Sequence, residues 1–204
     1  MIQLASKSPR RKELLEQIGV PFVVVEANVP EVMENGEQPI SYVERLAHAK
    51  ASAGVGLRPG RLTLGADTIV VCGEQVLEKP VDYVDFNRML KTLSGCTHQV
   101  ITAVALVDGM RSRLAHEVTE VEFGEISDQQ IRAYWASGEP HDKAGGYGIQ
   151  GLGAVFVERI SGSFSNVVGL PLTLVSRMLG EFGCPIWNGE YLAAPLSLTN
   201  QRSE

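Results

Sequence analysis

The chain has 204 residues, of which 44% are hydrophobic, and its 18 basic and 24 acidic side chains give a formal charge of -6 at pH 7. That length can bury a core in one domain or in two closely joined lobes. The acidic balance argues against a broad nucleic-acid-binding face, although it does not exclude a local basic pocket.

The cysteine pattern and the lack of long apolar runs indicate the cellular compartment of the protein. Cys72, Cys96 and Cys184 form no C-x-x-C pair, which argues against a disulfide framework and a zinc ribbon. The first residues lack the apolar region of a secretory signal, and no run of 18 apolar residues occurs. We therefore expect a cytoplasmic protein that does not contact a membrane.

The first elements are a short buried strand and a helix. Residues 2–5 are apolar enough for a buried strand. Ser8 is placed to cap the following helix, and Pro9 takes the first helical position, where its missing N–H has no cost. Gly19 is expected to end this helix.

A second strand and a longer helix follow. Residues 22–27 are rich in β-branched side chains, which predicts a strand, and a polar loop comes next. Residues 41–54 predict a helix that opens with the capping box Ser41-x-x-Glu44.

The middle of the chain predicts strands, a helix and a hairpin. Residues 61–80 resemble two strand segments interrupted at 65–68, and a helix starts at Asp82 or Asp85. Residues 98–123 form a long hairpin with Asp108-Gly109 as its turn.

The last third returns to mixed elements. The pattern Ser127-x-x-Gln130 caps a helix, and residues 154–160 and 172–182 predict a strand and a final helix. Residues 184–204 have weak periodicity, so we expect a partly irregular tail. Strands and helices that alternate early, with a hairpin in the middle, indicate an α/β fold with a mixed sheet.

The start of the first helix gathers hydroxyl and guanidinium groups. Ser6, Ser8, Arg10 and Arg11 lie at a helix N-terminus, whose free N–H groups and partial positive charge attract anions. Two arginines there are unfavourable unless an anion binds between them. The alternative is a plain Ser-Pro cap with solvated arginines.

Asp67 has apolar neighbours on both sides and is poorly placed for simple solvation. It is a candidate general base, a candidate metal ligand, or the side chain of an Asx-turn. Lys50, Lys79 and Glu31 are each ambiguous alone, since a lysine such as Lys50 commonly buries its stem and keeps its ammonium in water.

The segment "AGGYGIQGLG", residues 144–153, is the most specific of these features. Its glycines allow a close approach of the backbone to a ligand, and Tyr147 and Gln150 offer a ring and an amide. Rossmann and P-loop patterns are not matched in the right context. We interpret the segment as a binding loop. The cationic side chains suit a polyphosphate, and the carboxylates suit a Mg²⁺ ion or the activation of a water. The glycine-rich loop suits a nucleobase.

Six ordered motifs carry a resemblance to a known family. They are "LASKSPRRKELL", "ERLAHAKA", "LGADTIV", "LEKP", "AGGYGIQGLG" and "GSFSNVVGLP". In this order they resemble the Maf family of nucleotide pyrophosphatases, also described as septum-formation inhibitors. The similarity runs from about residue 2 to residue 182.

The resemblance implies an enzyme that hydrolyses a nucleoside triphosphate to its monophosphate and pyrophosphate. It further implies a divalent metal (Mg²⁺, with Mn²⁺ as the alternative) and a homodimer. The implied fold is an elongated mixed β-sheet with flanking helices, and two lobes surround a central cleft, as in the Maf and ITPase folds. A single catalytic domain would then span residues 1–183, with 184–204 as the tail.

The resemblance also assigns roles to residues. Asp67 matches the family's proton acceptor, and Glu31 and Asp67 are the implied metal ligands. Substrate-binding positions are Ser8, Arg10, Arg11, Lys50, Thr68, Lys79 and Gln150. The motif "YGIQG" resembles the branch that acts on dTTP and UTP. Two alternatives stay open: a pyrophosphatase of 7-methyl-GTP, ITP or XTP, and a non-catalytic module that binds a partner in cell division.

Overall fold

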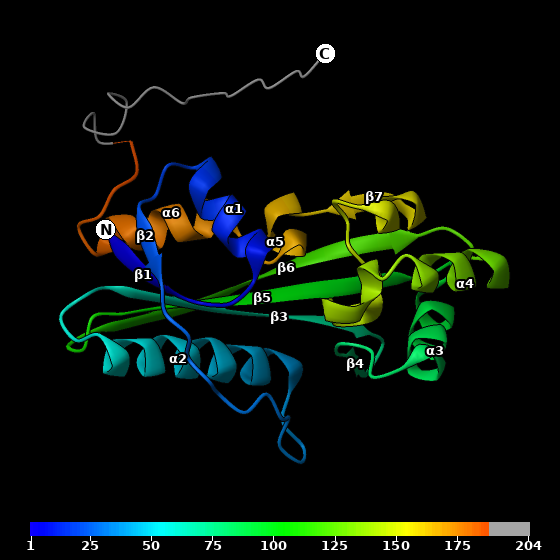
Figure 1. Ribbon diagram of the computed structural model, residues 1–204, viewed down its shortest axis with the longest axis horizontal. Coiled ribbons are helices and arrows are strands. Elements are labelled where there is room, and N and C mark those ends of the chain that lie inside the picture. Colours follow the sequence, from blue (N-terminus) through cyan, green and yellow to red (C-terminus); the bar gives the residue numbers. More distant parts are fainter. Residues whose placement is uncertain (188–204) are drawn as a thin grey trace.

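A computed structural model describes residues 1–187 of the chain, and in this range the protein is built around one seven-stranded sheet (Figure 1). The strand order is β2-β1-β3-β5-β6-β7, and β4 also pairs with β3. β1 pairs in parallel with β2 and β3, whereas the remaining pairs are antiparallel. The predicted α/β fold with a mixed sheet is therefore confirmed.

The elements have the following bounds. The strands are β1 (Ile2–Ala5), β2 (Phe22–Val24), β3 (Thr63–Cys72), β4 (Gln75–Leu77), β5 (Thr97–Val107), β6 (Ser112–Phe123) and β7 (Val157–Ser161). The α-helices are α1 (Pro9–Gln17), α2 (Pro39–Leu57), α3 (Tyr83–Leu93), α4 (Asp128–Ala136), α5 (Phe164–Val168) and α6 (Leu172–Glu181). Three 3-10 helices are η1 (Glu139–Asp142), η2 (Ala144–Gly146) and η3 (Leu152–Phe156).

Helices cover both faces of the sheet. The long helix α2 lies on one face, while α1, α5 and α6 lie on the other (Figure 1). Apolar side chains alternate along β3 and β5, so that Ile69 and Ile101 pack under α2 and Val70 and Val104 pack on the opposite face. The strands β3, β5 and β6 run on to the end of the molecule that carries α3, α4 and β4.

One glycine sets the distance between α2 and the sheet. A Cβ atom at Gly65 of β3 would overlap the Ala47 carbonyl oxygen and the Ala51 amide nitrogen of α2. Glycine therefore allows the helix backbone to lie directly on the strand. Lys50, which lies between those two alanines in the helix, is brought against β3 by the same contact.

Several local predictions are confirmed. Ser8 caps α1 and Pro9 is the first residue of that helix. Asp82, not Asp85, caps α3. Both hydrogen bonds of the capping box Ser127–Gln130 are present at α4.

Other local predictions are wrong. Helix α2 begins at Pro39, two residues before Ser41, so Ser41-x-x-Glu44 is not its capping box. A proline at the first helical position needs no N–H partner and therefore starts the helix there. The predicted strand 154–160 begins only at Val157, because the 3-10 helix η3 precedes it.

The structure tests only part of the predicted tail and of the prediction that the protein does not contact a membrane. Residues 184–187 are in neither helix nor strand, and the rest of the predicted tail, 188–204, lies outside the described residues. In the described part of the chain, no helix combines the length and apolar character that a bilayer crossing needs.

Candidate active site

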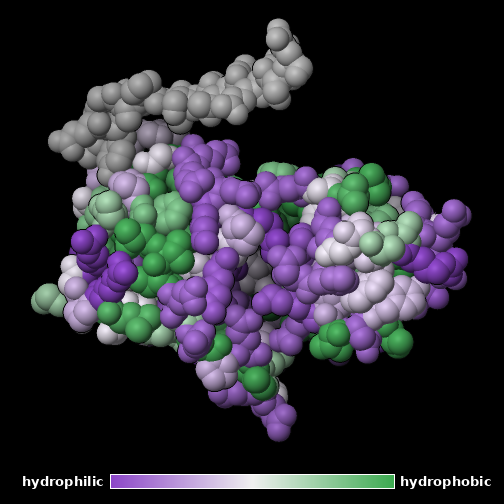
Figure 2. Space-filling model, viewed as in Figure 1, coloured by the Kyte–Doolittle hydropathy of each residue, from purple (hydrophilic) through white to green (hydrophobic). Residues whose placement is uncertain are grey.

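A gap in one edge of β3 creates the main cleft. On the side away from β5, β1 pairs with residues 63–65 of β3 and β4 pairs with residues 70–72. Within the described chain, residues 66–69 have no strand partner on this side. A cleft of about 1140 Å³ opens over this gap and forms the hollow in the middle of the face in Figure 2.

β3 itself does not break at residues 65–68, which corrects the expected interruption and excludes an Asx-turn at Asp67. Because side chains alternate along a strand, Asp67 points toward α2 and Thr68 points toward α1 and α5. Both side chains line the cleft. The unpaired edge between β1 and β4 is therefore what gives one cavity access to both faces of the sheet.

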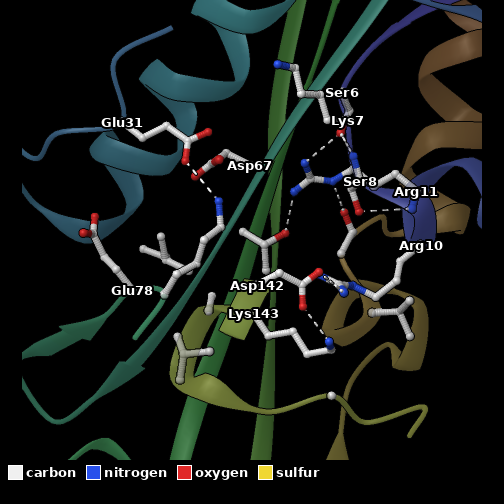
Figure 3. Close-up of a pocket in the computed structure, with 18 of the residues that line it drawn as sticks. Ser6, Lys7, Ser8, Arg10, Arg11, Glu31, Asp67, Glu78, Asp142 and Lys143 are labelled. Carbon is white, nitrogen blue, oxygen red and sulfur yellow. Dashed lines mark hydrogen bonds and ion pairs between the residues drawn. The ribbon is translucent and has the colours of Figure 1, made fainter. Parts of the chain in front are cut away.

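The acidic part of the site is organised by Lys50. The Lys50 Nζ lies 2.6 Å from Asp67 Oδ1 and 2.5 Å from Glu31 Oε1. Lys79 Nζ contacts the other oxygen of Glu31 at 3.3 Å. Asp67 and the Lys50 stem are buried, whereas Glu31 and Lys79 are partly exposed. Two carboxylates thus converge on one buried ammonium group (Figure 3).

Burial dominates the pKa of Asp67, whereas ion pairing dominates the pKa of Glu31. Burial raises the pKa of Asp67 above its ordinary value, although Lys50 and Arg11 offset part of this effect. Burial alone would also raise the pKa of Glu31, but its ion pairs with Lys50 and Lys79 dominate and lower that pKa. Asp67 is consequently the more basic of the two and the better proton acceptor.

Arg11 connects α1 to the sheet. Its guanidinium donates to Thr68 Oγ1 at 3.0 Å, to Ser6 Oγ at 3.3 Å and to the Gly169 carbonyl at 2.8 Å. Burial lowers the pKa of Arg11, while the nearby Asp67 carboxylate opposes the shift. The Ser8 Oγ accepts from the Arg11 N–H and so caps the helix. Ser8 and Arg11 are therefore held at the cleft by the start of α1.

The opposite wall comes from the segment between α4 and β7. Arg10 NH1 lies 3.2 Å from Asp142 Oδ2, and Lys143 Nζ lies 2.6 Å from Asp142 Oδ1 (Figure 3). Gln150, further along this segment, is exposed and lines the cleft. The Arg10–Asp142 ion pair joins the α1 side of the cleft to the glycine-rich side.

All the residues singled out from the sequence line this one cleft. They are Ser8, Arg10, Arg11, Glu31, Lys50, Asp67, Thr68, Lys79 and Gln150. Tyr147 differs from expectation, because only 6% of it is exposed and its hydroxyl pairs with His98 Nε2 at 2.8 Å. Its ring packs edge-on against Phe123. Tyr147 therefore belongs to the core beneath the loop, and Gln150 carries the polar group that faces the cleft.

The cleft offers two carboxylates, Glu31 and Asp67, as candidate ligands for a divalent cation. Within residues 1–187 no group of three or more His, Cys, Asp or Glu side chains is arranged to hold a metal. Mg²⁺ is commonly held by one or two carboxylates together with substrate phosphates and water. Asp67 and Glu31 meet this requirement, since their oxygens already converge on a single cation, the Lys50 ammonium.

The pattern that distinguishes Maf-like proteins matches residues 1–182, which include the whole cleft. The chain belongs to the Maf family. The family match therefore covers both walls of the cleft, the α1–β3 side and the glycine-rich side.

Relatives of this Maf chain are close over most of its length. A dTTP/UTP pyrophosphatase of Saccharophagus degradans is 53% identical over 190 residues, which cover 91% of this chain and 90% of the relative. A dTTP/UTP pyrophosphatase of Symbiobacterium thermophilum is 52% identical over 186 residues, with 91% and 96% covered. A solved structure of the Staphylococcus aureus Ham1 protein has a TM-score of 0.41 and 13% identity, and it covers 60% of this chain and 71% of that one.

Some residues of the Maf cleft were missed from the sequence. Glu78 lines it and accepts a hydrogen bond of 2.6 Å from Tyr42 OH. Asp142 and Glu139 line it on the other wall. Glu78 directly precedes Lys79, a residue singled out from the sequence, and Asp142 precedes Lys143 of the same cleft, so an acidic residue beside a lysine was the available signal. No sequence motif marks Glu139, whose carboxylate accepts from Tyr134 and from the N–H groups of residues 13 and 14 positions later.

Proposed function

We propose that this Maf protein hydrolyses dTTP and UTP to the nucleoside monophosphate and pyrophosphate. The proposal is supported by one observation above all. A buried carboxylate of raised pKa, Asp67, shares a cleft with six lysine and arginine residues and an exposed amide. The relatives at about 50% identity, which are named dTTP/UTP pyrophosphatases, agree with this reading.

In the proposed reaction, Asp67 orients and deprotonates a water that attacks the α-phosphorus. A base whose pKa is raised toward the working pH accepts a proton more readily, and burial supplies that shift at Asp67. The bond from the α-phosphorus to the bridging oxygen of the β-phosphate breaks, and pyrophosphate departs with its electron pair. The water's second proton stays on the monophosphate product.

The cationic side chains stabilise the charge of the triphosphate. Arg10 and Arg11 come from the start of α1, whereas Lys50 and Lys79 both pair with Glu31. Fixed positive groups in a partly buried cleft stabilise a developing anionic charge more strongly than they would in open water. Ser8 and Thr68 add hydroxyl donors to the α1 side. Arg10 and Lys50 must exchange their carboxylate partners for phosphate oxygens when substrate binds.

A divalent cation, for which we propose Mg²⁺, would be held by Glu31 and Asp67 and would neutralise phosphate charge when bound. An oxygen of Asp67 that binds a metal is not available as a base. We therefore assign metal binding chiefly to Glu31, whose lowered pKa keeps it ionised, and water activation to Asp67.

Gln150 is the proposed reader of the base. An amide offers one donor and one acceptor side by side, which match O4 and N3–H of thymine or uracil. Cytosine presents an amino group and an unprotonated ring nitrogen at the same two positions, so the pairing is reversed. The homodimer and the single domain of residues 1–183 remain proposals on the family resemblance, and the cytoplasmic location remains a proposal on the sequence pattern.

A panel of triphosphates tests the function directly. Pyrophosphate release from dTTP, UTP, dCTP, GTP, ITP and 7-methyl-GTP is measured with Mg²⁺, with Mn²⁺, and after chelation. We expect release from dTTP and UTP, and its loss on chelation. A preference for ITP or 7-methyl-GTP would reassign the substrate, and no release from any triphosphate would favour a module that only binds a partner.

The variant Gln150→Glu tests base reading. A carboxylate carries no N–H donor and repels O4 of thymine, so kcat/KM for dTTP and UTP should fall by about tenfold to a hundredfold. Steady-state kinetics with dTTP and GTP measure the change, and thermal unfolding controls for stability. A dTTP preference over GTP that survives the change would contradict the assignment of Gln150.

A further inference from the structure

The turn that carries Gln150, residues 148–151 of the glycine-rich loop, is anchored at its first residue by a tyrosine outside the loop. Tyr134, in the last turn of α4, is 5% exposed and accepts a hydrogen bond from the Gly148 N–H at 2.9 Å. Its own hydroxyl donates to Glu139 Oε1 at 2.8 Å. The Gly151 N–H donates to the Gly148 carbonyl at 3.3 Å, which closes a tight turn over Gln150.

The same loop is anchored at its far end by Glu139. The Leu152 N–H donates to Glu139 Oε2 at 2.8 Å, and the Gly153 N–H donates to Oε1 at 3.1 Å. Gly151 packs directly over this carboxylate, where a Cβ would overlap Oε2. Tyr134 and Glu139 therefore hold both ends of the turn, and Gln150, which lines the cleft, lies between these two anchors.

The protonation states of Tyr134 and Glu139 fix which group donates and which accepts in the hydrogen bond between them. Burial, followed by the neighbouring Glu139, raises the pKa of Tyr134, so its hydroxyl keeps its proton. Burial alone would raise the pKa of Glu139, but the N–H groups of Leu152 and Gly153 and the Tyr134 hydroxyl outweigh it and lower that pKa. A neutral phenol thus donates to an ionised carboxylate, which is a strong hydrogen bond.

We propose that Tyr134 and Glu139 are positioning residues that set the base selectivity of the site by fixing the turn that carries Gln150. This inference rests on the proposed function, because it requires that Gln150 reads the base. Neither residue reads the base itself. A reader displaced by about an ångström loses much of its discrimination, since a bidentate amide depends on both of its hydrogen bonds.

Tyr134→Phe is the decisive variant, because it removes one hydroxyl and keeps the ring. The readout is the ratio of kcat/KM for dTTP to that for dCTP, two pyrimidine nucleotides whose bases present reversed hydrogen-bonding groups at positions 3 and 4. We expect this ratio to fall about tenfold, chiefly through the KM for dTTP, while kcat for dTTP changes less than about threefold. Glu139→Gln, which keeps the size but turns one acceptor into a donor, should lower the ratio in the same direction.

A control and a coupling measurement separate positioning from a general loss of structure. Ser94 Oγ accepts the Ile126 N–H at 2.7 Å outside the cleft, so Ser94→Ala loses a comparable bond. It should lower the melting temperature and leave the ratio unchanged. Adding Tyr134→Phe to Gln150→Ala should change the ratio by less than about twofold, because residues that act through one another are not additive. Amide exchange at Gly148 should be faster in Tyr134→Phe whether or not the protein is catalytically active.

The outcomes distinguish this inference from the function on which it rests. A wild-type protein that does not hydrolyse dTTP, or that hydrolyses dTTP and dCTP equally well, overturns the proposed function and the inference together. A selective wild type whose ratio is unchanged by Tyr134→Phe and Glu139→Gln overturns the inference alone. So does an additive effect in the double variant. If Tyr134→Phe loses its cooperative thermal transition, Glu139→Gln decides by the same criteria.

Discussion

Asp67→Asn is expected to lower kcat for dTTP about a thousandfold, with a much smaller change in KM. A positioned general base contributes about a hundredfold to ten-thousandfold to a rate, and an amide cannot accept the water's proton. The variant should still fold, since Asn has the shape of Asp and Lys50 keeps its 2.5 Å contact with Glu31. Single-turnover hydrolysis, with enzyme in saturating excess over dTTP and with Mg²⁺ present, measures the effect on the chemical step.

Asp128→Asn is the matched control for this change. Asp128 lies in the first turn of α4 and does not line the cleft. Its exposed carboxylate pairs with Lys91 of α3. Its substitution should leave kcat within about twofold, as is usual for surface changes remote from a site. Turnover of Asp67→Asn within tenfold of the wild type would contradict the role of Asp67 as base.

The fold was largely predictable because its local signals agree with the packing. The cap at Ser8, the hairpin turn at Asp108-Gly109 and the capping box at Ser127 all stand where the structure has them. The predictions that failed depend on contacts between distant segments. β3 reads as interrupted at Gly65, but that glycine is there because α2 lies against the strand, and only the tertiary contact shows it.

The membership of the site was predictable and its arrangement was not. The resemblance brought Asp67, Lys50 and Gln150 together by their motifs, and all three line one cleft. What joins them is the unpaired stretch of β3 between β1 and β4, which depends on where two short strands end. The supports of Gln150 were also hidden, because Tyr134 precedes it by 16 residues and carries no motif of its own. From the sequence alone, a tyrosine in a helix is predicted to be a core residue, and only the structure shows the partners of its hydroxyl.

Lys50→Met should destabilise the fold by about 3–5 kcal/mol at pH 8, because it removes the cation shared by Asp67 and Glu31. Without that ammonium the pKa of folded Asp67 rises further above its unfolded value of about 4. A raised carboxyl pKa means that stability is lost as pH rises through the interval between the two values. The destabilisation should therefore be largest at pH 8 and become smaller near pH 4, where the folded Asp67 carboxyl is protonated and no longer needs the ammonium partner. Urea unfolding at the two pH values measures the difference.

Lys79→Met provides the comparison, since Lys79 pairs with the same Glu31 at 3.3 Å but its side chain is 58% exposed. An exposed ion pair contributes about 0–1 kcal/mol, so this variant should be only slightly less stable at either pH. Equal losses for the two lysines would show that burial of the Lys50 ammonium does not matter to the fold. A Lys50→Met loss that is the same at pH 4 and pH 8 would show that the lysine acts through packing of its stem and not through the charge of Asp67. The expected contrast, a large pH-dependent loss at Lys50 and a small one at Lys79, follows from the depth at which each ammonium meets its carboxylates.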